Sequence, residues 1–279
     1  MINCIRWAYP NISRIYRDSF LRQKSLVNFL EQELGDNYYE YILEIGSGIG
    51  RFTKFLYKKY RNSNIISIDT NENAIKMLKR VFKPRHNFKL LVHNAIKPLF
   101  FNKFDLITGF QIYPFLEQPD LVFESLLKQL KNNGKMVIFE LDMFNLETNI
   151  INDELKLFYN SLKKGFEYFG CHYDLYNLKK HFNKNIVKLE IKKFVFEEKT
   201  VLRPELFNML KNTNNPNSEL YKETVDFYYQ FLSKAGWSRI DSEEFFKRFL
   251  TFEIYREHIG ELLIKKIPYY SFKIKKMST

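Results

Sequence analysis

A single stretch constrains the fold of this chain more than any other: an apolar strand that runs through an acidic residue into three alternating glycines. Residues 41–50 read Tyr-Ile-Leu-Glu-Ile-Gly-Ser-Gly-Ile-Gly. Glycine adopts positive φ angles and lets a ligand approach the backbone where a Cβ would collide. Residues 51–60 continue as a predicted helix, whose free N-terminal amides point back at that ligand. The stretch therefore predicts a strand, a nucleotide-cradling turn and a helix.

The spacing of the glycines argues against a dinucleotide ligand. The dinucleotide fingerprint needs its third glycine three residues after the second, beside a pyrophosphate. Here the third glycine, Gly50, is only two positions after Gly48, and position 51 is Arg. The carboxylate of Glu44 would also repel a pyrophosphate, because like charges at close range repel. A zwitterionic ligand that carries an amino group and a sulfonium would tolerate this carboxylate.

This E-x-G-x-G-x-G turn closely resembles motif I of the class I S-adenosylmethionine-dependent methyltransferases, in particular the small-molecule members similar to methyltransferase type 11. The resemblance covers about residues 12–140 well and the remainder by topology. It implies that S-adenosylmethionine is the cofactor and that S-adenosylhomocysteine is the product. The cofactor-binding residues that it implies in this turn are Glu44, Gly46, Ser47, Gly48 and Gly50.

The ends of the next two predicted strands extend the resemblance. The apolar run 64–69 stops on Asp69, where a carboxylate can accept hydrogen bonds from both ribose hydroxyls. Thr70 follows it directly. After the next strand, Asn94 stands where relatives usually have Asp, and its side-chain oxygen can accept a hydrogen bond from the adenine amine. The resemblance thus implies that Asp69, Thr70, Asn94 and Ala95 also bind the cofactor.

The fourth predicted strand, residues 104–110, brings candidate residues for the reaction itself. It delivers Phe110, a further cofactor contact, and Tyr113 to the carboxyl edge of the sheet, where open α/β sheets bind ligands. Tyr113 and His172 are the candidate general bases, and such a base is needed only if the acceptor is protonated. Glu140, at the end of the fifth strand, could orient an acceptor.

The alternation of strands and helices predicts an α/β fold with a Rossmann-like, mostly parallel, seven-stranded sheet and helices on both faces. We expect an N-terminal helical segment over the cofactor site (1–36), the cofactor-binding core (37–141), and a remainder (142–279) with a helical substrate cap mainly at 202–249. A turn is expected at 131–134, before strand five. Strand six is expected at 185–198 and an antiparallel strand seven at 257–268.

Net charge and cysteine content limit which partners, metal sites and cellular locations can be expected for this protein. The 279 residues include 44 basic and 32 acidic side chains, for a net charge of +12, which suits RNA, an anionic membrane or an acidic carrier protein. The lysines are scattered, which is typical of solvated faces. Two separated cysteines predict neither a disulfide framework nor a zinc site, and no apolar run is long enough to span a membrane. We therefore expect no metal and a cytoplasmic location.

These features predict methyl transfer to oxygen or nitrogen of a small apolar or aromatic metabolite, with an acyl group on an acyl carrier protein as a variant. One alternative is an RNA or DNA methyltransferase, which the basic charge and a distant likeness of residues 111–114 to an Asn-x-Pro-Tyr turn suggest. Its proline and tyrosine are reversed here. The other alternative is a non-catalytic, cofactor-binding partner protein.

Overall fold

The structure is a computed structural model that describes residues 23–83, 85–142, 145, 147–169, 175–182, 187–205, 208, 215 and 217–276. Its contacts divide the chain into two compact units. The core unit comprises the described residues within 13–142, 172–194 and 269–279, and the helical unit those within 143–171 and 195–268. No helix among the described residues is long and apolar enough to cross a membrane.

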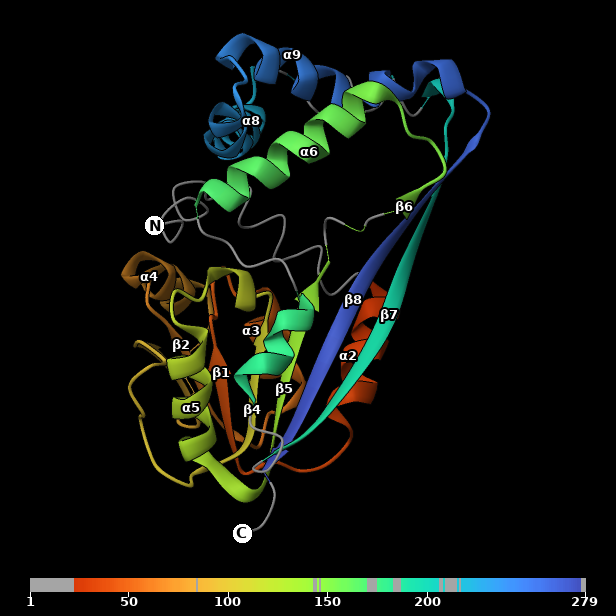
Figure 1. Cartoon of the computed structure of the whole chain (residues 1–279). Helices are drawn as coiled ribbons and strands as arrows, with labels where there is room; N and C mark the ends of the chain where they lie inside the picture. Colours follow the sequence, from red (N-terminus) through yellow and green to blue (C-terminus); the bar gives the residue numbers. More distant parts are fainter. Residues whose placement is uncertain are drawn as a thin grey trace. The chain divides into compact units, whose positions relative to one another are not determined.

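The structure contains an eight-stranded sheet, one strand more than predicted (Figure 1). Its strands are ordered β3-β2-β1-β4-β5-β8-β6, with β7 paired to β8. The first five pair in parallel and β8 runs antiparallel to β5, which confirms the predicted Rossmann-like α/β fold. Their bounds are β1 Tyr41–Ile45, β2 Asn64–Asp69, β3 Phe88–Val92, β4 Phe104–Phe110, β5 Leu130–Leu141, β6 Glu147–Thr148, β7 Val187–Val201 and β8 Leu262–Lys276.

Helices cover both faces of the sheet in the core unit. On one face, Phe139 of β5 packs against Phe29 of α2 (Lys24–Leu34) and Phe52 of α3 (Arg51–Lys59). Helix α4 (Glu72–Val81) joins this layer through a small cluster with β3. Helix α5 (Pro119–Gln129) and the 3-10 helix η3 (Leu175–His181) belong to the other face. Helix α2 lies within the predicted N-terminal helical segment, and that this segment covers the cofactor site stays a prediction.

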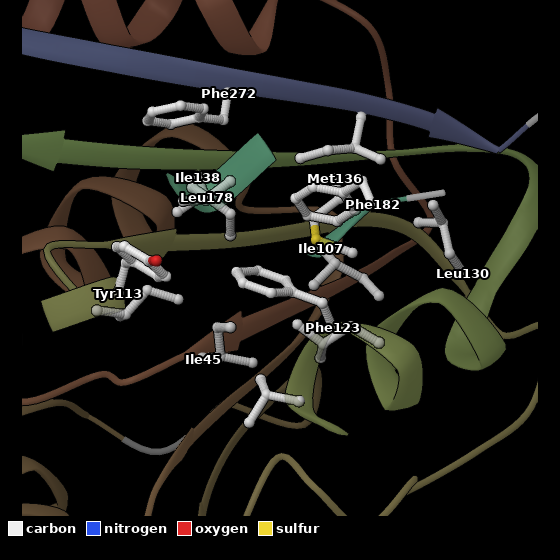
Figure 2. Close-up of a cluster of buried hydrophobic side chains, with 14 of the residues drawn as sticks. Ile45, Ile107, Tyr113, Phe123, Leu130, Met136, Ile138, Leu178, Phe182 and Phe272 are labelled. Atoms are coloured by element: carbon white, nitrogen blue, oxygen red, sulfur yellow. The ribbon is translucent and has the colours of Figure 1, made fainter. Parts of the chain in front are cut away.

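The main hydrophobic core lies between the sheet and the α5 and η3 layer (Figure 2). Met136 and Ile138 of β5 are fully buried there, as is Phe123 of α5. Leu178 of η3 and Phe182 close the cluster, and the Phe182 ring lies 4.8 Å from that of Phe123. Leu175, Leu178 and Phe182 recur at intervals of three and four residues, which places their side chains on the same side of a helix. This side faces the core.

Two predicted boundaries are wrong. Residues 131–134 lie within β5 as an irregularity in its register with β4, where a Cβ on Gly134 would come within 2.8 Å of the Phe104 carbonyl oxygen. The last strand begins at Leu262 instead of 257, because residues 253–258 form the 3-10 helix η5 (Glu253–His258) and Gly260 takes a φ of 94°. It continues to Lys276, since buried residues recur along 269–274. The short β6 was not predicted.

The helical unit is built around stacked aromatic rings. Helices α6 (Asp153–Tyr168), α8 (Glu219–Leu232) and α9 (Arg239–Leu250) form it, and α9 begins with a capping box between Ser238 and Asp241. Phe158 stacks on Phe245 at 4.5 Å, and Phe166 on Phe231 at 4.1 Å. These rings therefore fill the unit's own core. That this unit caps the carboxyl edge of the sheet stays a prediction.

Candidate active site

The glycine turn has the backbone geometry that its sequence predicts. Gly46, Gly48 and Gly50 take φ angles of 65°, 52° and 80°. Gly50 is the N-cap of α3, so the first amides of that helix face the turn. Within the part of the chain that the structure describes, the Ser47 hydroxyl oxygen is buried without a hydrogen-bond partner. A helix N-terminus beside an unsatisfied hydroxyl fits a polar ligand such as the predicted cofactor.

Asp69 lies next to this turn, as the βαβ arrangement requires. Its Oδ2 accepts a hydrogen bond from the Gly48 N–H at 2.8 Å, and its Oδ1 accepts one from Asn71 N–H at 2.8 Å. Burial raises the pKa of this carboxyl, and the backbone hydrogen bonds oppose the shift. Each carboxylate oxygen keeps a second lone pair, so Asp69 can still accept from ribose hydroxyls. The geometry fits the ribose-binding role predicted for it.

The side chain of Glu44 is buried next to the glycine turn. It is 1% exposed, and its Oε1 accepts a hydrogen bond from the Thr53 hydroxyl at 2.9 Å. Burial raises the pKa of Glu44 to about 7, while the hydroxyls of Ser67 and Thr53 oppose the shift. The carboxyl therefore titrates near neutral pH. In this structure it ties strand β1 to helix α3.

The other predicted cofactor-binding residues follow β2 and β3. Thr70 and Asn94 are exposed, and Ala95 is half-buried against the main core. The Asn94 side-chain oxygen accepts a hydrogen bond from the Ile96 N–H at 3.0 Å. An amide oxygen has two lone pairs, so one remains for an adenine amine. The cofactor contacts of Thr70 and Ala95, and the adenine contact of Asn94, stay predictions.

The segment after β4 touches the glycine turn. A Cβ on Gly46 would come within 2.5 Å of Cγ2 of Ile112, so the two residues are packed as closely as glycine allows. Gln111 has a φ of 56°, which is uncommon for a residue with a side chain. Its side-chain oxygen lies 3.4 Å from an Arg51 nitrogen. Phe110, a predicted cofactor contact, is buried and stacks on Phe52 of α3 at 5.7 Å.

Glu140 holds this same segment from β5. Its Oε1 accepts hydrogen bonds from the N–H groups of Ile112 at 3.0 Å and Tyr113 at 2.9 Å. The residue is 0% exposed, and burial raises its pKa to about 8 against the effect of these two backbone hydrogen bonds. Burial thus favours the protonated form of this carboxyl, whereas the two amide hydrogen bonds favour its ionised form.

Tyr113, the candidate base, points into the core of the sheet and helices (Figure 2). It is 2% exposed, and its hydroxyl lies 3.1 Å from Nε2 of His181. Nδ1 of His181 lies 2.5 Å from Oδ1 of Asp120. His172, the other candidate base, lies outside the described residues. The sequence offered no periodic signal for His181 and Asp120, which reach Tyr113 only through the fold.

The comparisons with known proteins find similarity to methyltransferases. The model described as "Methyltransferase domain" matches residues 43–136. Protein 235L of Invertebrate iridescent virus 6, named as a methyltransferase, is 22% identical over 238 residues, which are 81% of this chain and 88% of the relative. The malonyl-[acyl-carrier protein] O-methyltransferase of Priestia megaterium is 25% identical over 243 residues, 81% of this chain and 83% of the relative. A protein of the same activity name from Ilyobacter polytropus is 30% identical over 139 residues, half of each chain.

A solved structure of a protein named as a methyltransferase has a similar fold. A Bacillus halodurans protein named as a methyltransferase aligns with a TM-score of 0.54 at 14% identity, over 91% of this chain and all of that chain. Among the described residues of this chain, no group of three or more His, Cys, Asp or Glu could hold a metal ion. The glycine turn, the strand order and these similarities identify residues 43–136 as a methyltransferase domain, and they support a methyltransferase that uses S-adenosylmethionine as its methyl donor.

Proposed function

We propose that this enzyme methylates a carboxyl group of a small acyl substrate that is attached to an acyl carrier protein. The observation that carries the proposal is the similarity to two proteins named malonyl-[acyl-carrier protein] O-methyltransferase, one of which aligns over 81% of this chain. The net charge of +12 supports an acidic carrier as partner, because opposite charge speeds association. A small apolar or aromatic metabolite is the broader class.

The site chemistry is compatible with a carboxylate acceptor. S-adenosylmethionine supplies an electrophilic methyl group, so the protein has to align the acceptor and exclude water, which together can supply roughly 7 to 11 kcal/mol. A carboxylate is ionised at neutral pH and needs no general base. The candidate base Tyr113 is buried and its hydroxyl is hydrogen-bonded to His181, so its placement favours an acceptor that arrives deprotonated.

The test is methyl transfer from S-adenosylmethionine with a labelled methyl group. Malonyl-acyl carrier protein, the same carrier without the malonyl group, malonyl-coenzyme A and total RNA are offered separately. We expect label on the malonylated carrier alone, and we expect alkali to release it as methanol, since a methyl ester is cleaved by base and an N-methyl group is not. The Asp69→Ala variant is the control, because loss of cofactor binding should abolish the signal.

The other outcomes each contradict the proposal in a defined way. Label in RNA would support the nucleic-acid alternative. Equal transfer to malonyl-coenzyme A would remove the carrier from the recognised substrate. Binding of S-adenosylhomocysteine without transfer to any of these acceptors would favour another small metabolite or the non-catalytic partner protein.

A further inference from the structure

The turn formed by residues 111–113 is both strained and placed against the cofactor loop. Gln111 takes a φ of 56°, and its N–H donates to the Phe139 carbonyl oxygen at 2.7 Å, which ends the ladder between β4 and β5. The next residue, Ile112, packs on Gly46 of the glycine turn. Strained backbone persists only where the surroundings over-determine it, and such residues gather at functional sites. Something must therefore hold this turn in place.

Glu140 is the group that holds it. One carboxyl oxygen accepts from both Ile112 and Tyr113, at 3.0 and 2.9 Å, so it provides an acceptor for the amides of two buried residues. The second oxygen, Oε2, is buried and has no hydrogen-bond partner among the described residues. Burying a carboxyl group is costly, because even its neutral form gives up hydrogen bonds to water. The burial of Glu140 is thus unfavourable by itself, and its structural effect is to fix the 111–113 turn.

We infer that Glu140 is a positioning residue for cofactor binding, which acts by holding Ile112 against Gly46 and so fixes the shape of the glycine turn. The contacts run from the carboxyl oxygen of Glu140 to the Ile112 N–H, and from the Ile112 side chain to Gly46. All these residues belong to the core unit. Glu140 thus acts on the glycine turn through Ile112, and its effect on methyl transfer is indirect.

The inference is tested with two substitutions at Glu140. Glu140→Gln keeps an oxygen that can accept both hydrogen bonds, whereas Glu140→Leu has a similar size and no acceptor. S-adenosylhomocysteine is titrated calorimetrically into each purified variant, after circular dichroism has shown that it is folded. We expect Glu140→Leu to weaken binding at least about tenfold, which corresponds to about 1.4 kcal/mol, and Glu140→Gln to bind nearly as wild type.

Thr108→Val is the matched control. Thr108 lies on β4, is 0% exposed, and donates its hydroxyl to the Val137 carbonyl oxygen at 2.8 Å, so the variant also loses a buried hydrogen bond in the same sheet. The hydrogen bond that this variant loses does not involve the 111–113 turn. We expect Thr108→Val to be less stable than wild type and to bind S-adenosylhomocysteine with unchanged affinity. Weakened binding in this variant would mean that affinity follows stability alone, and it would overturn the inference.

Amide hydrogen exchange and a second variant keep the inference testable if Glu140→Leu does not fold. In folded Glu140 variants, the amides of Ile112 and Tyr113 should exchange faster only where the acceptor is lost. Ile112→Ala removes the contact with Gly46 directly and should weaken S-adenosylhomocysteine binding by itself. Wild-type affinity in Ile112→Ala or in folded Glu140→Leu, or an equal loss in Glu140→Gln and Glu140→Leu, would overturn the positioning role.

Discussion

The hydroxyl of Tyr113 lies 3.1 Å from Nε2 of His181, and the opposite ring nitrogen of His181 lies 2.5 Å from Oδ1 of Asp120. Because a carboxylate only accepts hydrogen bonds, we assign the proton of neutral His181 to Nδ1, which leaves Nε2 as the acceptor for Tyr113. The His181 ring also stacks against Phe123 of α5. Three helical segments, η2 (Tyr113–Phe115), α5 and η3, are joined at this point.

Tyr113→Phe should therefore affect stability more than turnover. Removal of the hydroxyl leaves the buried Nε2 of His181 unpaired, at a cost of about 1 to 3 kcal/mol in the free energy of unfolding. A carboxylate acceptor needs no base, so we expect turnover with malonyl-acyl carrier protein to be retained. Tyr39→Phe is the matched control, since the buried Tyr39 donates to the Leu34 carbonyl oxygen at 2.6 Å.

Denaturant unfolding and a methyl-transfer assay on both variants check this prediction. A drop in turnover of about 10² or more in Tyr113→Phe alone is the size expected for loss of a general base, and it would support the catalytic role predicted for Tyr113 from the sequence.

Asp69→Ala should weaken S-adenosylhomocysteine binding by about 1.5 to 3 kcal/mol, the usual contribution of hydrogen bonds to a charged group. The variant also loses the acceptor of the Gly48 N–H, so the turn itself becomes less ordered. Asp36→Ala is the control, because the Asp36 side chain is 99% exposed. Calorimetric titration compares the two. Unchanged affinity in Asp69→Ala would show that the ribose does not lie beside this carboxylate.

The elements predicted well from the sequence are those whose signal is local. The glycine turn, the apolar strands and the carboxylate that ends β2 each occupy a short stretch, and parallel strands bring their carboxyl ends to one edge. The 2.8 Å contact between Gly48 and Asp69 follows from this arrangement. The antiparallel last strand was also anticipated, although its bounds were displaced.

Contacts that depend on tertiary structure could not be predicted in the same way. Asp120 and His181 are separated by 61 positions, and neither has a motif around it. The pairing of Glu140 with the amides of Ile112 and Tyr113 likewise depends on the register between β4 and β5. The segment 131–134 looked like a turn from its composition, yet it continues into β5 because the sheet overrides local propensity there.

Gly46→Ala should be more damaging than an alanine at another glycine with positive φ. Gly236 has a φ of 94° and no atom within 4 Å of a built Cβ, so Gly236→Ala incurs only the backbone strain, about 1 to 2 kcal/mol. At Gly46 the Cβ also meets Ile112 at 2.5 Å, and such overpacking adds about 1 to 3 kcal/mol. Thermal unfolding and S-adenosylhomocysteine titration check both variants. We expect only Gly46→Ala to lose affinity, and equal affinities would contradict the contact with Ile112.

The stability of the enzyme should fall as pH rises through the neutral range. Burial raises the pKa values of Glu44 to about 7 and of Glu140 to about 8, from an ordinary value of 4.5. Between about pH 4.5 and 8 the folded state therefore binds more protons than the unfolded state, so the free energy of unfolding decreases with rising pH. Glu44→Gln combined with Glu140→Gln should flatten this slope in urea titrations at pH 5, 6, 7 and 8. Glu72→Gln is the control: Glu72 is exposed and pairs with Lys76, which lowers its pKa, so its stabilisation is lost only at acid pH. A slope that persists in the double variant would assign the effect to other groups.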